Sequence, residues 1–150
     1  MTGDLRVAVL GVGMMGAFHA DALATRVKGA RVVVVNDFAA DKAAGVAERV
    51  GARVVADPFE AIADPEVDAV LIATPGAAHA GQVQACLDAG KPVLCEKPLT
   101  TDEASSYALV QAEAALERPH IQLGFMRRFD AEYVALKELI TSGGLGNPLL

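Results

Sequence analysis

Short apolar segments alternate with longer segments of mixed apolar and polar residues along the whole chain. Most of the apolar segments run without polar interruption, which is typical of parallel strands whose two faces are covered by helices. They predict strands at Leu5–Leu10, Arg31–Asn36, Arg53–Ala56, Ala69–Ala73, Pro92–Cys95 and Ile121–Gly124. The intervening segments predict helices at Met14–Val27, Asp41–Val50, Pro58–Ala63, Ala78–Ala89, Asp102–Leu116 and Ala131–Thr141. This alternation predicts an α/β fold with a doubly wound parallel sheet.

A glycine-rich turn, Gly11-Val12-Gly13-Met14-Met15-Gly16, joins the first predicted strand to the first predicted helix. We expect Gly11 to allow the tight turn, Gly13 to let a pyrophosphate approach the backbone, and Gly16 to let the helix pack closely on the strand. Asp37 follows the next strand, about twenty residues beyond the last glycine. Strand, turn, helix and acid together predict a dinucleotide-binding Rossmann fold, with an ordinary glycine turn in an α/β domain as the alternative.

The start of the first helix is a candidate anion site. Its free backbone N–H groups, including those of Met14 and Met15, point toward the turn and carry the positive end of the helix dipole. The sequence therefore predicts that this turn holds the phosphates of the dinucleotide.

Asp37 bears on the choice between NAD and NADP. A carboxylate at this strand end accepts hydrogen bonds from the adenosine ribose hydroxyls and repels a 2′-phosphate. The segment from Asn36 to Ala40 contains no arginine, and the nearest cation, Lys42, belongs to the following helix. The sequence therefore favours NAD as the cofactor, although Asp37 could instead, or in addition, cap that helix.

Composition narrows the class of protein. The chain has 150 residues, of which 53% are hydrophobic, and a formal net charge of −6, which is enough chain for one well-buried domain. The acidic balance, without basic clusters, argues against a nucleic-acid or membrane surface, and no run suits a membrane span or a signal peptide. Cys86 and Cys95 lack metal-ligand spacing, and we expect them to be buried, reduced thiols. These features predict a soluble cytoplasmic domain without a metal site.

A second charged motif, Glu96-Lys97-Pro98, follows a later apolar strand. Charged residues at the carboxyl end of a parallel strand lie at the ligand crevice of such a sheet. Taken alone, the motif is more often a solvated strand end followed by a turn.

Together with the glycine turn, this motif makes the chain resemble the glucose–fructose oxidoreductase/inositol dehydrogenase (Gfo/Idh/MocA) family over essentially its whole length. The resemblance is carried by Gly11–Gly16, Asp37, Ala73-Thr74-Pro75 with His79, Ala89–Leu99 and Gly124–Asp130. The last segment, Gly-Phe-Met-Arg-Arg followed by an aromatic residue and Asp, is similar to the inositol 2-dehydrogenase branch. The Thr74-Pro75-Gly76 sequence is instead the general family form, which leaves related sugars open as substrates.

The resemblance implies an NAD-dependent oxidoreductase that oxidises a carbinol of a ring polyol, myo-inositol or a related sugar, to the ketone. It implies that Lys97 is the active-site lysine that hydrogen-bonds the reacting oxygen, often with a cis bond to Pro98. It also implies that Glu96 helps to hold the nicotinamide ribose. Further positions carried over are the dinucleotide-lining Thr74, Pro75 and His79, and Met126 and Arg127 beside the nicotinamide and polyol.

A cluster of breaker residues, Ser142 to Pro148, separates the last helix from a new apolar segment. We therefore expect a cofactor domain at residues 1–142 and the start of a truncated substrate domain at residues 143–150. The resemblance implies that the Asp/His general base belongs to that second domain, and that the full-length form is a homo-oligomer. His19 is expected to be a packed helix residue. The chain is then the inactive cofactor half of a dehydrogenase, or alternatively a non-catalytic dinucleotide-binding module or fragment.

Overall fold

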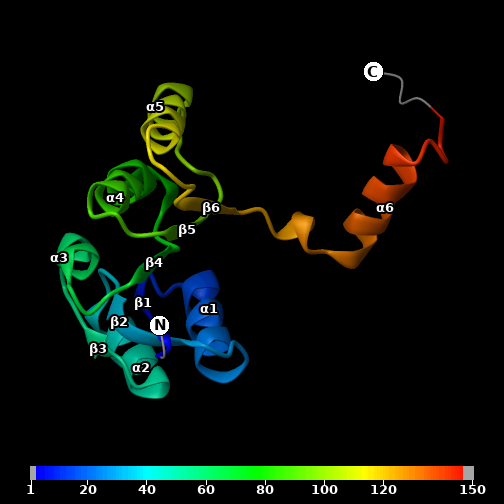
Figure 1. Cartoon of the computed structure of the whole chain (residues 1–150). Helices are drawn as coiled ribbons and strands as arrows, with labels where there is room; N and C mark the ends of the chain where they lie inside the picture. Colours follow the sequence, from blue (N-terminus) through cyan, green and yellow to red (C-terminus); the bar gives the residue numbers. More distant parts are fainter. Residues whose placement is uncertain (1–2, 147–150) are drawn as a thin grey trace.

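The computed structural model describes residues 3–146, in which six parallel strands form one sheet in the order β3-β2-β1-β4-β5-β6. The strands are β1 (Leu5–Leu10), β2 (Ala30–Asn36), β3 (Arg53–Val54), β4 (Ala69–Ile72), β5 (Val93–Glu96) and β6 (Ile121–Gly124). The helices are α1 (Met14–Thr25), α2 (Ala40–Val50), α3 (Pro58–Ala63), α4 (Gly76–Asp88), α5 (Glu103–Ala114) and α6 (Ala131–Thr141), with a 3₁₀ turn η1 (Met126–Arg128). The strand order reverses between β1 and β4, which confirms the doubly wound sheet (Figure 1).

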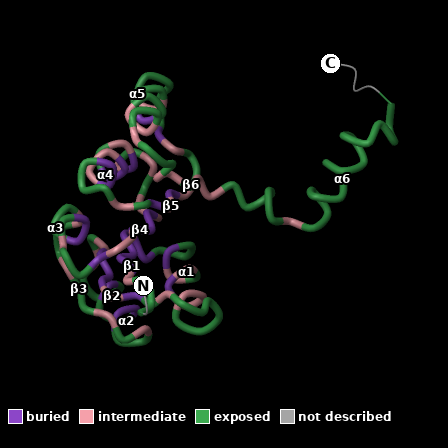
Figure 2. Tube along the Cα trace, in the orientation of Figure 1, coloured by how far each residue is buried: buried purple, intermediate pink, exposed green. Residues whose placement is uncertain are grey.

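Two apolar cores lie on opposite faces of the sheet, because successive side chains of a strand point to opposite sides. On one face, Leu10 and Ile72 pack with α3, α4 and α5. On the other face, Val9 and Val35 pack with α1 and α2. The buried segments in Figure 2 accordingly concentrate on the strands and on the inward sides of the helices.

The helical cover is less even than the apolar strands suggested. On the α1 side, helices contact β1, β2 and β3. Further along the sheet, Leu94 of β5 and Ile121 of β6 line an open groove of about 420 Å³. Both residues are only partly buried, so within residues 3–146 the helices leave part of β5 and β6 uncovered.

Several predicted boundaries were wrong by a few residues. Helix α1 ends at Thr25, because the chain turns toward Gly29, which has a φ of 81°. Strand β3 has only two residues, because the chain leaves the sheet before Asp57 caps α3. Helix α4 begins at Gly76, directly after Pro75, and the 3₁₀ turn η1 was not predicted.

Beyond β6 the chain extends away from the body of the domain, and α6 contacts η1 (Figure 1). No residue of α6 is buried. The predicted new strand at residues 149–150 lies outside the described residues, and the boundary at residue 142 stays a prediction. Within residues 3–146, we find no helix with the length and apolar character needed to cross a membrane.

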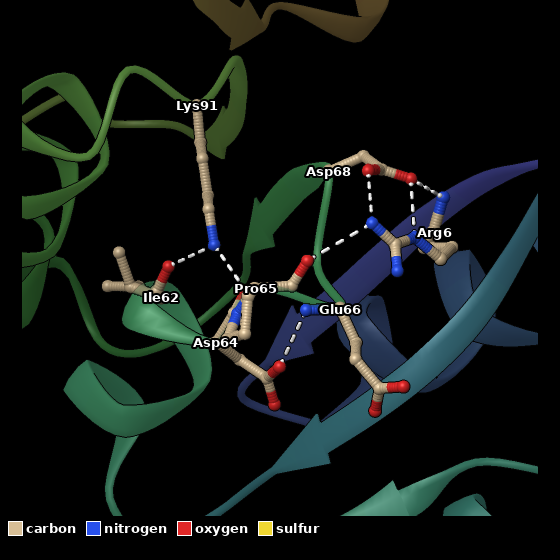
Figure 3. Close-up of polar contacts among 7 residues, drawn as sticks. All are labelled: Arg6, Ile62, Asp64, Pro65, Glu66, Asp68 and Lys91. Carbon is tan, nitrogen blue, oxygen red and sulfur yellow. Dashed lines mark hydrogen bonds and ion pairs between the residues drawn. The ribbon is translucent and has the colours of Figure 1, made fainter. Parts of the chain in front are cut away.

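Polar contacts fasten the amino edge of the sheet (Figure 3). Arg6 donates from Nη2 and Nε to the two carboxylate oxygens of Asp68, at 2.7 and 2.9 Å, and thereby joins β1 to the segment before β4. Lys91 donates through Nζ to the backbone carbonyls of Ile62 and Asp64, both at 2.6 Å, and so satisfies the end of α3. This network lies at the opposite edge from the strand ends that carry the motifs.

Candidate functional site

The three glycines of the turn after β1 have different surroundings. Gly11 has a φ of 78°, and a Cβ there would lie 2.7 Å from the carbonyl carbon of Ala73. A Cβ on Gly16 would overlap the carbonyl oxygen of Gly11. A Cβ on Gly13 would meet no atom of the described chain within 4 Å. Gly11 and Gly16 are therefore required by the turn itself, whereas Gly13 faces open space.

Helix α1 offers its first backbone N–H groups to that space. Its N-cap is Gly13, which has no side chain to accept from them, and within the described chain no acidic residue occupies the first turn. Helices α5 and α6 differ, because Asp102 and Asp130 accept hydrogen bonds from their first turns. Met14 is 86% exposed beside the turn. The start of α1 can therefore receive an anion.

Asp37 ties the end of β2 to the glycine turn. Its Oδ2 accepts from the backbone N–H of Val12 at 2.8 Å, and its Oδ1 accepts from Ala39 N–H at 2.9 Å. The N-cap of α2 is Ala39, so Asp37 does not cap that helix in the way the sequence left open. Both oxygens keep lone pairs for a further donor, since a carboxylate accepts about four hydrogen bonds.

A cavity of about 480 Å³ lies at the carboxyl ends of β1, β2 and β4. Among the predicted residues it brings together Gly11, Gly13, Asp37, Thr74 and Pro75. Sequence reasoning missed the others, which are Asn36, Phe38, Lys42, Ala56, Pro58, Ala73, Ala78 and Gln82. Lys42 lines the same cavity as Asp37, since it lies in the first turn of α2, although the sequence had placed it apart from the cofactor choice.

His79 supports the site from within the protein. It is 1% exposed, and its Nδ1 lies 2.7 Å from the carbonyl oxygen of Pro98 while its Nε2 lies 2.8 Å from that of Thr74. Thr74 also donates from Oγ1 to Gln82. The imidazole therefore connects the loop after β4 to the loop after β5, and it is not among the residues that line the large cavity.

Lys97 follows β5 with an exposed side chain, and the Lys97–Pro98 bond is cis, as the resemblance implied. A second cavity, of about 180 Å³, is lined by Lys97, Gly124, Phe125, Met126 and Arg127. Arg127 is oriented by Asp130, which accepts from Nη1 at 2.7 Å, and by the Tyr133 ring, whose centroid lies 4.9 Å from its guanidinium carbon. The structure thus brings together the three residues expected near the substrate.

His19 was expected to be a packed helix residue, and it does lie in α1 with a side chain that is only 24% exposed, but its contact with a motif residue was not predicted. Its Nε2 lies 2.8 Å from Oε1 of Glu96, at the end of β5. One signal was available in the sequence, because His19 comes three residues after Gly16 and therefore shares its sheet-facing side of the helix. Gly16, which packs against the turn, marks the face of α1 that meets the strand ends, and His19 lies on the same face.

The two cysteines are not candidates for nucleophilic chemistry. Cys86 and Cys95 are both buried and free, as expected. Burial raises the pKa of each thiol to about 12, so both stay protonated near neutral pH.

The motif residues form a row along the carboxyl edge of the sheet. Following the strand order, Asp37 comes after β2, the glycine turn after β1, Thr74 after β4, Lys97 after β5 and Arg127 after β6. The anion-receiving turn lies where the strand order reverses, which is where ligands bind in doubly wound sheets. The residues present therefore fit a dinucleotide that extends from Asp37 toward Lys97.

Comparisons with known proteins identify the family and the fold of this chain. A family profile described as "Oxidoreductase family, NAD-binding Rossmann fold" matches residues 5–125. Inositol 2-dehydrogenase of Rhodococcus erythropolis is 62% identical over 148 residues, which are 98% of this chain and 43% of that protein. The chain thus spans less than half the length of this relative.

Solved structures give the same result. The myo-inositol dehydrogenase of Lactobacillus casei, in complex with NAD(H) and myo-inositol, superposes with a TM-score of 0.91 at 36% identity, over 97% of this chain and 44% of the other. The scyllo-inositol dehydrogenase of the same organism, with NAD(H) and scyllo-inositol, has a TM-score of 0.89 at 30% identity, over 96% and 43% of the two chains.

Proposed function

Because this chain belongs to the Gfo/Idh/MocA oxidoreductase family with its NAD-binding Rossmann fold, we propose that it is the cofactor-binding half of an NAD-dependent dehydrogenase of ring polyols. The substrate is myo-inositol or a related cyclic polyol or sugar, and the product is the corresponding ketone. The names of the relatives support this substrate class.

The observation that carries the proposal is the row of residues from Asp37 to Lys97 along one sheet edge. The glycine turn, with the N–H groups of Met14, Met15 and Gly16, receives the pyrophosphate. Asp37 accepts from the adenosine ribose hydroxyls, while Thr74 and Pro75 line the same cavity. Glu96 holds the nicotinamide ribose, and His79 acts indirectly, through the carbonyls of Thr74 and Pro98.

Lys97 stabilises the reacting oxygen. Oxidation of a secondary alcohol removes a hydride from carbon and a proton from oxygen, and bound NAD⁺ supplies the hydride acceptor. Lys97 lines the smaller cavity, and its ammonium hydrogen-bonds the oxygen and favours the negative charge that develops on it. Met126 and Arg127 line the same cavity and position the polyol.

The described residues offer Lys97 no obvious partner base. Both ring nitrogens of His79 lie within hydrogen-bond distance of backbone carbonyls, and His19 pairs with Glu96. As the family resemblance implies, we assign the general base, an Asp/His pair, to a substrate domain outside this chain. The second candidate function, a dinucleotide-binding module without turnover, is favoured for this chain alone by the same observation.

Isothermal titration of this chain with NAD⁺ and, separately, NADP⁺ tests the proposal. We expect saturable binding of NAD⁺ and much weaker binding of NADP⁺. No binding of either dinucleotide would contradict the cofactor assignment.

Activity is tested on a chimera of this chain and the C-terminal part of the Rhodococcus relative. NADH formation with myo-inositol or scyllo-inositol is the expected result. Binding of NAD⁺ without turnover of any cyclic polyol would favour the non-catalytic module.

We also propose a cytoplasmic location, which rests on the composition of the chain. The homo-oligomeric state of the full-length form rests on the family resemblance.

A further inference from the structure

Three segments of the chain meet at the carboxylate of Glu96. His19, from the second turn of α1, approaches Oε1 at 2.8 Å. The backbone N–H of Lys97 lies 3.4 Å from Oε2. A Cβ added to Gly124, at the end of β6, would lie 3.2 Å from the same Oε2. The carboxylate is therefore confined between the glycine-turn helix, the lysine and the last strand.

The side chains of His19 and Glu96 are largely shielded from solvent, which strengthens the hydrogen bond between them. The side chains of His19 and Glu96 are 24% and 13% exposed, so water competes only partly for their hydrogen bond. A glutamate carboxylate at the end of a strand can otherwise rotate about three side-chain bonds, and one directed donor favours a single orientation. Because Gly124 has no side chain, the Glu96 carboxylate has room for this orientation.

We propose that His19 is a positioning residue for Glu96, and that this pair holds the carboxylate in the orientation that binds the nicotinamide ribose. The inference rests on the proposed function, since it takes the nicotinamide end of the dinucleotide to lie beside Lys97. His19 is not among the residues that line the adenosine cavity. It acts through Glu96 alone.

The competing interpretation is a tie that only attaches α1 to the sheet. The same helix carries such a tie on another side, because Asp21 accepts from Nε of Arg49 on α2 at 2.9 Å. Asp21 is absent from both cavities. Asp21→Asn is therefore a matched control that removes an ion pair of α1 without touching Glu96.

The test compares two probes, NAD⁺ and ADP, on this chain. ADP carries the adenosine and the pyrophosphate but lacks the nicotinamide ribose. We expect His19→Ala to raise the Kd for NAD⁺ by about tenfold, the usual cost of losing one hydrogen bond to a charged group, and the Kd for ADP by less than about twofold. His19→Gln, whose amide can donate in place of Nε2, should restore most of the NAD⁺ affinity. Asp21→Asn should change neither Kd.

A double-mutant cycle completes the test. In the Glu96→Ala background, His19→Ala should have no further effect on the Kd for NAD⁺, because the partner through which it acts is gone. Equal weakening of NAD⁺ and ADP binding by His19→Ala would overturn the inference in favour of a structural tie. Unchanged NAD⁺ binding would also overturn it. Failure of the unmodified chain to bind NAD⁺ would instead count against the proposed function.

Discussion

The carboxylate of Asp37 accepts a hydrogen bond from the backbone N–H of Val12 at 2.8 Å, which connects the end of β2 to the middle of the glycine turn. The residue that we propose for ribose binding thus also braces the turn that we propose for phosphate binding. Removing its charge and removing its side chain are therefore different experiments.

Asp37→Asn removes the charge and keeps an oxygen that can accept from Val12. We expect this variant to shift the ratio of NADP⁺ to NAD⁺ affinity by about tenfold toward NADP⁺, because the repulsion of a 2′-phosphate is lost. Asp37→Ala should weaken NAD⁺ further, since the turn loses its brace. Titration calorimetry measures both Kd values.

Lys42 provides the control for this shift. It lines the same cavity, and in the absence of the carboxylate it is the cation available to a 2′-phosphate. Adding Lys42→Ala to Asp37→Asn should reverse the gain for NADP⁺. An unchanged dinucleotide preference in Asp37→Asn would count against a ribose role for Asp37.

Lys97→Ala separates chemistry from binding. In the chimera with the substrate domain of the Rhodococcus relative, we expect turnover to fall by roughly a hundredfold or more, because the developing charge on oxygen loses its ammonium partner. The Kd for NAD⁺ should change little. Lys28→Ala, an exposed lysine after α1, is the control. Equal turnover of the Lys97 variant and the control would reduce Lys97 to a strand-end charge.

His79→Leu tests the buried link between the two loops. It keeps a similar volume and leaves the carbonyls of Thr74 and Pro98 without their donor. We expect the free energy of unfolding in urea to fall by about 2–4 kcal/mol. His120→Ala, at the other edge of the sheet, should cost about 0.5 kcal/mol or less. A similar loss in both variants would mean that the His79 contacts contribute nothing specific.

The pair of Arg6 and Asp68 predicts how stability depends on acid. The side-chain hydrogen bond from Arg6 holds the pKa of Asp68 well below its ordinary value of 3.8. The folded state therefore binds fewer protons there, so the pair contributes stability above pH 4 that is lost as the pH falls below it. Asp68→Asn should lower the urea midpoint at pH 6 and flatten its fall between pH 5 and pH 2. Parallel pH profiles of the two proteins would refute this assignment.

The sequence predicted what local patterns determine. Uninterrupted apolar runs fix the strands, and each motif falls at a strand end, so the edge of the sheet that carries Asp37, Thr74 and Lys97 was predictable. Contacts between residues far apart in the sequence could not be predicted in this way. His19 and Glu96 are 77 positions apart, and only the packing of α1 across the strand ends brings them together. The presence of Lys42 in the cavity likewise depends on how α2 lies on the sheet, which its own periodicity does not specify.

Gly13 and Gly16 provide the most direct separation of fold from function. Both belong to one turn, but a Cβ on Gly16 would overlap the carbonyl oxygen of Gly11, whereas a Cβ on Gly13 would meet nothing in the described chain within 4 Å. Gly13 also has a φ of −61°, which alanine adopts freely. We therefore expect Gly16→Ala to lower the free energy of unfolding by about 3 kcal/mol, and Gly13→Ala to leave it nearly unchanged.

The same two variants should respond in the opposite way to ligand. In Gly13→Ala the added methyl group occupies the space through which a phosphate reaches the first N–H groups of α1, so NAD⁺ and ADP should both bind at least about tenfold more weakly. Urea unfolding and calorimetry on the same preparations measure the two effects. Gly3→Ala, outside the turn and also free of neighbouring atoms, is the control that should alter neither. If Gly13→Ala bound both ligands normally, the open space beside Gly13 would not be the phosphate site. The proposed dinucleotide site from Asp37 to Lys97 would then lack a phosphate-binding element.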